Sequence, residues 1–306
     1  MAQFLLRRIA LSVFVVLVVT LLVAWAIRLS GDPAMMLAEG SSVTEKDLQN
    51  IRTALGLDRP FSAQYAGFVA GMLTGDMGKS FMGGVPVARM VAQALPLTLM
   101  LAGLSLAASL LMSVPLGVHA AVHRGGAADQ AIRIVSLIGL SFPNFWLAIM
   151  LVLVFAITLG WLPPSGADSA LGVIMPVATM AIILTATNVR LVRSSMLEIL
   201  SAQFVTVARS KGLSETVVLY KHALRNCAIP LITYIGLQFG GLIGGVVVVE
   251  RVFNWPGMGS LAFDAVASRD YPVLQAVVTV LATLIVLVNL FIDLIYGVVD
   301  PRVRRE

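Results

Sequence analysis

The chain has 306 residues, of which 58% are hydrophobic and 12% are charged, with a mean hydropathy of +0.94. An ordinary soluble domain has about 45–50% apolar and about 25% charged residues, so these values predict a polytopic membrane protein. Cys227 is the only cysteine in the sequence, which excludes an intrachain disulfide and a cysteine-based metal cluster. The net charge of +5 is expected to reflect membrane orientation and not a nucleic-acid partner.

Six apolar runs are long enough to cross a hydrocarbon core about 30 Å thick, which takes roughly 20 helical residues. Because backbone groups in lipid must be hydrogen-bonded within their own segment, each run is expected to be an α-helix. Pro96, Pro115 and Pro143 predict kinks or helix ends inside or beside these runs. The predicted fold is all-α, with six transmembrane helices at residues 9–27, 95–122, 134–160, 171–189, 226–249 and 271–292.

The charges predict the orientation of these spans. Arg7 and Arg8 precede the first run, but that run is longer than a usual signal peptide core and no small-residue cleavage pattern follows it. We therefore expect an uncleaved first span with a cytoplasmic N-terminus. Six spans then return the C-terminus to the same side, where the inner segments hold 13 of the 21 Lys and Arg residues. This excess favours two cytoplasmic termini.

The connection between the first two spans is too long for a simple turn. Ser42 and Glu45 form a capping-box pattern, which predicts a helix ending near Gly56. Pro60 is expected to open a second helix that Gly75 closes. These signals predict a small helical region on the external side.

The same connection contains Gly78-Lys79-Ser80, which looks like the end of a phosphate-binding loop. The required glycine five residues before Gly78 is Leu73, and the preceding segment is predicted to be a helix and not a strand. We therefore do not expect this chain to bind ATP.

The second long connection, residues 190–225, lies on the inner side and is rich in Lys and Arg. Its pattern predicts two short amphipathic helices, with Gly212 as a left-handed C-cap and Ser214 as the next N-cap. Two interpretations stay open from the residues alone. The hairpin presents a ridge to a protein partner, or it lies on anionic lipid headgroups.

A series of short motifs runs in a fixed order along nearly the whole sequence. They are Gly31-Asp32-Pro33, Leu55-Gly56-Leu57-Asp58-Arg59-Pro60, Gly75-Asp76-Met77-Gly78-Lys79-Ser80, Leu140-Ser141-Phe142-Pro143, Ala208-Arg209-Ser210-Lys211-Gly212-Leu213-Ser214-Glu215, His222-Ala223-Leu224-Arg225-Asn226, Val249-Glu250-Arg251-Val252-Phe253-Asn254-Trp255-Pro256-Gly257-Met258-Gly259, Arg269-Asp270-Tyr271-Pro272 and Asp300-Pro301-Arg302. In these motifs the chain resembles the membrane subunits of ABC importers, specifically the peptide/nickel permease family.

The resemblance implies a type I ABC importer permease fold. It implies an N-terminal segment with the first helix at 1–30, an external helical subdomain at 31–94, and a five-helix core at 95–306 that contains a cytoplasmic coupling loop at 190–225. Aligned on Gly212, the general signature of such permeases matches this chain only at Ala208, Gly212 and Leu224. This looks like the peptide-family variant of the signature.

The resemblance also implies roles for individual residues. Ala208 permits close approach of an ATPase subunit and Gly212 makes the bend, while the docking surface is expected to involve Ala208, Arg209, Lys211, Gly212, Leu213, Ser214, Glu215, Leu219 and Tyr220. The loop after the fifth span is expected to form the outer gate and to contact a binding protein through Glu250, Arg251, Trp255, Pro256 and Gly257.

Small residues recur every four positions in the fifth span, at Gly236, Gly240 and Gly244, which predicts close helix packing or a pathway lining. Gln238 is the nearest polar candidate for the pathway. Asp293, in the last span, fits a structural hydrogen-bonding role or a proton relay. His119 and His123 share a helical face but have no evident third ligand nearby, so no metal site is predicted.

The implied activity is transport and not catalysis: a permease subunit that moves peptides or related small solutes, including glutathione or nickel chelates, by alternating access in a bacterial cytoplasmic membrane. The implied partners are a second similar permease, two cytoplasmic ATPase subunits that bind ATP and Mg, an external solute-binding protein and membrane lipid. No cofactor of its own and no nucleic acid are expected. The alternative is a self-contained secondary transporter, which should show two related halves and ionisable residues at the midplane.

Overall fold

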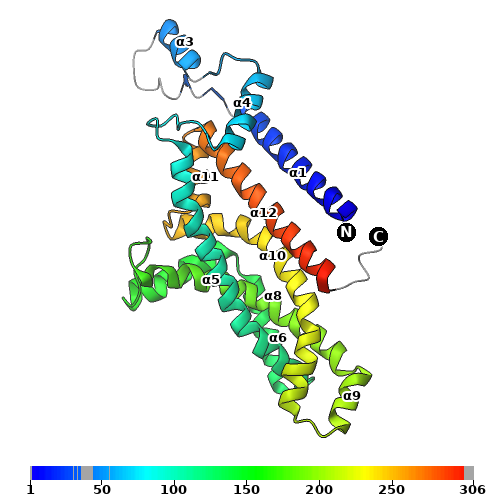
Figure 1. Cartoon of the computed structure of the whole chain (residues 1–306). Helices are drawn as coiled ribbons and strands as arrows, with labels where there is room; N and C mark the ends of the chain where they lie inside the picture. Colours follow the sequence, from blue (N-terminus) through cyan, green and yellow to red (C-terminus); the bar gives the residue numbers. More distant parts are fainter. Residues whose placement is uncertain (1, 30, 33, 36–43, 55, 300–306) are drawn as a thin grey trace. The chain divides into compact units, whose positions relative to one another are not determined.

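The computed structural model describes residues 2–29, 31–32, 34–35, 44–54 and 56–299. Regular structure within these residues is helical, apart from one isolated bridge between Lys79 and Pro86. In chain order (Figure 1) the helices are α1 Ala2–Leu29, α3 Glu45–Ala54, α4 Phe61–Thr74, α5 Val87–Val122, α6 Ala127–Ser141, α7 Asn144–Leu151, the π-helix η1 Val152–Thr158, the 3₁₀-helix η2 Ala170–Val173, α8 Ile174–Leu200, α9 Gln203–Ser210, the π-helix η3 Val217–Ala223, α10 Leu224–Val252, α11 Met258–Ala267 and α12 Tyr271–Val299.

Five helical segments in the described part of the chain are long and apolar enough to cross a membrane. A sixth crossing is made only if the pair α6 and α7–η1 counts as one span, and this pair is bent by 99°. The expected span over residues 134–160 is therefore broken, at the proline where the sequence predicts a kink or a helix end. The helix breaks because Pro143 disfavours the helical conformation of Phe142, which is extended at φ −91° and ψ 131°.

The other two prolines behave differently. Pro96 and Pro115 both lie inside α5, which continues through them over 36 residues. Neither proline ends the helix. The structure thus confirms a helix end at Pro143 and contradicts one at Pro96 or Pro115.

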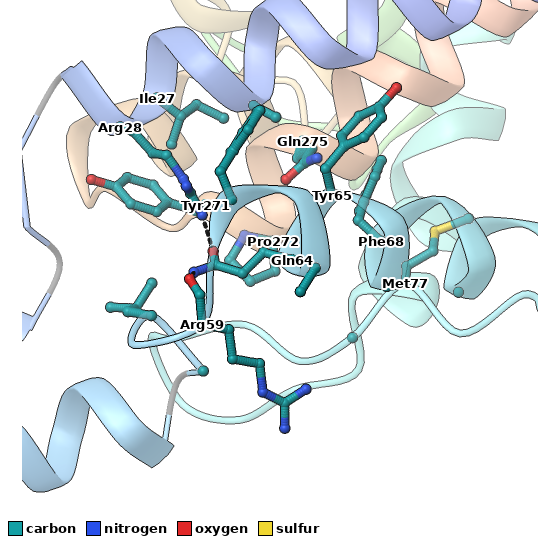
Figure 2. Close-up of a pocket in the computed structure, with 18 of the residues that line it drawn as sticks. Ile27, Arg28, Arg59, Gln64, Tyr65, Phe68, Met77, Tyr271, Pro272 and Gln275 are labelled. Carbon is teal, nitrogen blue, oxygen red and sulfur yellow. Dashed lines mark hydrogen bonds between the residues drawn. The ribbon is translucent and has the colours of Figure 1, made fainter.

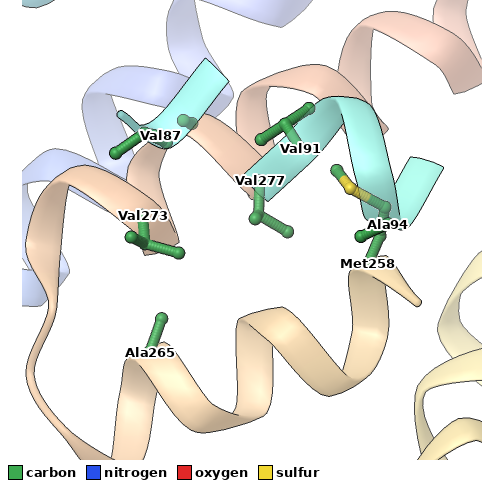
Figure 3. Close-up of a cluster of buried hydrophobic side chains, with 8 residues drawn as sticks. Val87, Val91, Ala94, Met258, Ala265, Val273 and Val277 are labelled. Carbon is green, nitrogen blue, oxygen red and sulfur yellow. The ribbon is translucent and has the colours of Figure 1, made fainter. Parts of the chain in front are cut away.

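The chain divides into two compact units, and the first contains Met1–Thr98 and Pro256–Leu290. Its apolar core joins the start of α5 to α11 and α12 (Figure 3). The hydroxyl oxygen of Thr98 accepts a hydrogen bond of 2.7 Å from the backbone N–H of Met258, the first residue of α11. This bond satisfies one of the unpaired donors at the helix start. The buried core side chains are Val87, Val91, Ala94, Met258, Ala265, Val273, Ala276 and Val277.

The segment Gly78-Lys79-Ser80 also belongs to this unit, and its last residue contacts a protein carboxylate. Asp270 is buried and accepts hydrogen bonds from the Ser80 hydroxyl and from the backbone N–H of Phe81, the latter at 3.1 Å. The Ser80 oxygen in turn accepts from the N–H of Met82 at 3.1 Å. These contacts give the segment a structural role at the entry to α12.

The two helices between α1 and α5 begin and end largely as expected. α3 starts after Thr44, whose hydroxyl and backbone N–H donate to the Asp47 carboxylate at 2.6 and 3.0 Å and lower its pKa. The predicted cap Ser42 lies outside the described residues, and Thr44 with Asp47 supplies a capping box two residues later. α4 follows Pro60 and ends at Gly75, which has the expected left-handed conformation with φ +81°.

The second unit contains Leu99–Trp255 and Phe291–Glu306. Its largest apolar cluster joins α5, α8, η3 and the start of α10. α5 and α8 approach closely at Gly117, where an added Cβ would lie 2.7 Å from the Cβ of Val192. One more contact between these helices is polar, since the buried Asn188 side-chain amide donates to the Ser109 hydroxyl oxygen at 3.0 Å.

Candidate functional site

The connection over residues 190–225 forms a compact helical hairpin at the end of α8. α9 covers Gln203–Ser210, and the chain then reverses at Gly212, which has φ +77° as the sequence predicts. The next helix begins at Glu215 directly after Ser214 and continues through η3 into α10 as far as Val252. The expectation of a separate second short helix is therefore wrong, because no glycine or proline interrupts the sequence after Ser214 until Pro230.

A small apolar core holds the hairpin together. Val205 and Ala208 of α9 pack against Val218 of η3, and all three side chains are buried. Ile199 and Leu200, at the end of α8, cover the same core. Ala208 thus lies on the inner face of the hairpin, where its small side chain lets α9 approach η3 closely.

The outer face of the hairpin is exposed and mixed in character. Arg209 and Glu215 form an ion pair across the turn, with Nε and Oε1 2.7 Å apart and a second contact of 3.3 Å. Four large apolar side chains of the hairpin are also more than one third exposed: Phe204, Val207, Leu213 and Tyr220. We call these four residues and the Arg209–Glu215 pair the hairpin face.

The structure separates the predicted coupling residues into two groups. Arg209, Lys211, Gly212, Leu213, Ser214, Glu215 and Tyr220 are exposed, whereas Ala208 is buried and Leu219 packs against the cluster around Val118. Sequence reasoning missed Phe204 and Val207. The signal was present in α9, where apolar residues occur as two pairs, Val205 with Ala208 inside and Phe204 with Val207 outside.

The glycines of α10 do not share one environment. A Cβ at Gly236 would run into the side chain of Ile292, whereas a Cβ at Gly244 would meet nothing within 4 Å. Gly240 is half-buried, and Gln238 lies between these positions with its side-chain oxygen buried and without a hydrogen-bond partner. Gly236 therefore serves helix packing, and Gly244 faces open space within this chain.

The segment after α10 is built around buried side chains. Glu250 and Trp255 are both buried, and the Trp255 N–H donates to the Glu250 carbonyl at 2.8 Å. Arg251 and Pro256 are exposed, and Gly257 caps α11. Of the five residues predicted to contact a partner, two are therefore exposed and three are buried.

Comparison with known proteins identifies the class of protein. Residues 113–305 match the family described as "Binding-protein-dependent transport system inner membrane component", and residues 1–102 match the N-terminal family of the same transport systems. The chain belongs to this family. It is the membrane permease subunit of an ABC importer.

Individual relatives match the permease over almost its whole length. It is 39% identical to the "Probable peptide ABC transporter permease protein y4tP" of Sinorhizobium fredii, with 99% of this chain and 100% of the relative covered. It is 38% identical to the glutathione transport system permease protein GsiC of Pectobacterium atrosepticum, with 98% of each chain covered. These matches support transport and give no support to a self-contained secondary transporter.

A solved structure shows the same fold. An inward-facing form of the MetNI methionine ABC transporter matches with a TM-score of 0.60, covering 69% of the permease and 96% of that chain at 18% identity. The likeness concerns the fold alone. With the apolar helices described above, it places the permease among multi-pass, all-α membrane proteins.

The first unit of the permease also contains a cavity of about 440 Å³ lined by α1, α4 and the start of α12 (Figure 2). Arg28 points into it, donates to the Gln64 side chain and lies 4.5 Å above the centre of the Phe61 ring. Gln64 in turn donates to the Arg59 carbonyl at 2.8 Å. The side chain of Arg28, one of the two arginines that line this cavity, is therefore used in contacts within the unit.

Two further sequence candidates remain. The His119 and His123 rings contact each other in a tilted arrangement with centroids 4.3 Å apart, and a nitrogen of His123 lies 3.0 Å from the His119 carbonyl oxygen. The side chain of Asp293 lies outside the described part of the structure. Its role stays a prediction.

Proposed function

We propose that this permease carries peptides or peptide-like solutes such as glutathione into the bacterial cytoplasm, as half of a pathway formed with a second, similar permease. The named relatives support this solute class, because a peptide permease and a glutathione permease are about equally similar to this chain. An external solute-binding protein delivers the solute, and Arg251 and Pro256 are the exposed residues of the predicted contact segment.

The observation that carries the proposal is the hairpin face. A hairpin that exposes four large apolar side chains and an ion pair has the composition of a protein-binding ridge. We infer that it docks on a cytoplasmic ATPase subunit, one for each permease. ATP and Mg are bound by those subunits, and this chain needs no cofactor of its own.

Helix continuity gives the hairpin a mechanical connection to the membrane. The helical segment that starts at Glu215 continues through the π-helix η3 and past Pro230 as far as Val252. Movement of the hairpin when the ATPases close is therefore transmitted directly to α10. Tilting of this helix supplies the step that changes the side of the membrane to which the pathway is open.

The experiment is co-purification of ATPase subunits with tagged permease variants. Val207→Asp and Leu213→Asp place a charge on the hairpin face, and both should lose the ATPases and ATP-driven uptake of a labelled dipeptide. Arg124→Asp, in the exposed turn between α5 and α6, is the matched control and should keep both. If the two hairpin variants retain the ATPases as the wild type does, the docking assignment is wrong.

A further inference from the structure

A second cavity, of about 1020 Å³, lies within the second unit between α6, α8 and α10. α6 lines it with Gln130, Arg133, Ile134 and Leu137, which follow the i, i+3, i+4, i+7 spacing of one helical face. α8 lines it with the same spacing from Thr187 to Ser194, and α10 adds Tyr234. Its volume is at the upper end of the range for sites that hold small molecules, about 300–1,000 Å³.

Three arginines line this cavity, and one of them is neutralised. Arg193 pairs with the fully buried Asp129 through two contacts of 2.6 and 2.7 Å. Asp129 also accepts from the N–H of Gly125 at 2.9 Å, so the positions of its two oxygens are fixed. Arg193 is therefore part of the wall.

The other two arginines have no such partner. Arg133, on α6, and Arg190, on α8, make no hydrogen bond or ion pair with any residue that the structure describes. Both side chains are exposed to the cavity side of their helices, and Asp129 is already engaged with Arg193. The cavity thus carries two positive charges that have no hydrogen-bond or ion-pair partner among the described residues, one on each of two walls, and the charge of Arg133 also interacts with that of Asp129.

Two guanidinium groups at one cavity specify the chemistry of a ligand. Each guanidinium binds a carboxylate or phosphate through two parallel N–H donors. Ile134, Leu137 and Leu191 add apolar lining beside these guanidinium groups. Arginines that serve only to orient a membrane protein need no such convergence, because single contacts with lipid headgroups suffice.

The cavity lies in the part of α8 that leads to the hairpin. Arg190 is ten residues before the end of α8 at Leu200, about 15 Å along the helix axis, and α9 follows two residues later. A solute held here is on the hairpin side of the span.

We propose that this cavity binds a solute with two acidic groups, with Arg133 and Arg190 each contacting one of them, and that it is the last binding position of the transported solute before release. The statement that the bound solute is also the transported solute rests on the proposed importer function. The binding itself does not depend on ATP or on a binding protein. A lipid phosphate has the same chemistry, so the experiment must separate the two sources.

The test measures binding to the purified full-length permease in nanodiscs of phosphatidylcholine by titration calorimetry, without ATP. The probes are reduced glutathione with two carboxylates, dialanine with one, and dialanine amide with none. Affinity should fall in that order. Arg133→Gln and Arg190→Gln should each weaken glutathione binding about tenfold or more, since a charge-assisted hydrogen bond contributes about 1.5–3 kcal/mol and about 1.4 kcal/mol is tenfold.

Two controls keep the result interpretable. Arg124→Gln removes an exposed arginine that does not line the cavity and should bind glutathione as the wild type does. Arg190→Lys keeps the charge without the two-pronged geometry and should give an intermediate affinity. Neither cavity arginine has a partner to lose among the described residues, so an unchanged elution profile and melting temperature are expected for the Gln variants.

Two outcomes would overturn the proposal. One is glutathione binding that is unchanged in both Arg133→Gln and Arg190→Gln. The other is absence of probe binding together with phosphatidylglycerol that co-purifies with the wild type and not with these variants, which identifies a lipid as the occupant. Failure here leaves ATPase co-purification untouched, so it is distinguishable from failure of the proposed function.

Discussion

Two ion pairs of the permease have almost the same geometry and opposite surroundings. The Arg193 Nε and Asp129 Oδ1 atoms are 2.6 Å apart, and the two side chains are 19% and 0% exposed. Arg209 and Glu215 are 2.7 Å apart, with side chains 45% and 60% exposed. Water competes for the second pair and is largely excluded from the first, so equal distances do not mean equal contributions.

This contrast gives a prediction about stability. Asp129→Asn should lower the stability of the purified permease by about 1.5–3 kcal/mol, because the Arg193 guanidinium loses a charged acceptor in a mostly buried position. Glu215→Gln, in the exposed pair, should change it by about 0–1 kcal/mol. Thermal unfolding in detergent, followed by tryptophan fluorescence, measures both. Equal shifts for the two variants would show that burial does not distinguish these pairs.

A second prediction concerns the bend at Gly212. Its φ of +77° is costly for a β-branched residue, by roughly 1–2 kcal/mol, while asparagine tolerates this conformation. No other atom lies within 4 Å of a Cβ built there, so the effect is one of backbone conformation and not of collision. Gly212→Val should reduce ATP-driven dipeptide uptake several-fold and Gly212→Asn should largely keep it. Uptake that is equal in both variants contradicts this explanation.

At the scale of helices, glycine has different functions in the same element. In α5, a Cβ at Gly117 would lie 2.7 Å from the Val192 side chain and 3.0 Å from the Val189 carbonyl oxygen of α8. A Cβ at Gly103 would meet nothing within 4 Å. The first glycine sets the distance between two helices, and the second does not.

The pair predicts opposite results for the same substitution. Gly117→Ala should destabilise the permease by about 1–3 kcal/mol, because the α5–α8 contact must open. Gly103→Ala should be neutral or slightly stabilising, since alanine is the better helix former. Melting temperature and the yield of folded protein after detergent extraction measure the difference. A melting temperature for Gly117→Ala at or above that of the wild type would show that Gly117 does not set the distance between α5 and α8.

Sequence signals predicted these elements unevenly, and the reasons are physical. Apolar runs located the spans because lipid demands long uncharged helices, and Pro60, Gly75 and Gly212 marked helix ends through their own backbone preferences. Composition could not show that Pro143 bends a span by 99° while Pro115 lies in a continuous helix, because neighbouring helices decide that outcome. From the sequence, Arg133 and Arg190 could be recognised only as charges on the predicted inner side of the membrane. That both line one cavity depends on how α6 and α8 pack.

At the scale of the whole molecule, the bent pair decides the topology. If α6 and α7–η1 together cross the membrane, the described helices make six crossings, and the hairpin lies on the side opposite to α3 and to the loop before α8. If the pair enters and leaves on one side, every later segment changes sides. The distribution of Lys and Arg favours the first topology, because the hairpin region is rich in both.

Cysteine labelling can distinguish the two topologies, because Cys227 is fully buried and should react little with a membrane-impermeant maleimide. Lys46→Cys in α3 and Asp168→Cys before α8 are at exposed positions and should be labelled in intact spheroplasts. Arg124→Cys and Ser210→Cys, in the turn after α5 and at the end of α9, should be labelled only after permeabilisation. A reversal of Asp168→Cys and Ser210→Cys alone, with Lys46→Cys and Arg124→Cys as expected, would mean that the bent pair is re-entrant. The hairpin face would then lie outside the cell, where no ATPase could reach it, so this one measurement tests the topology and the coupling assignment together.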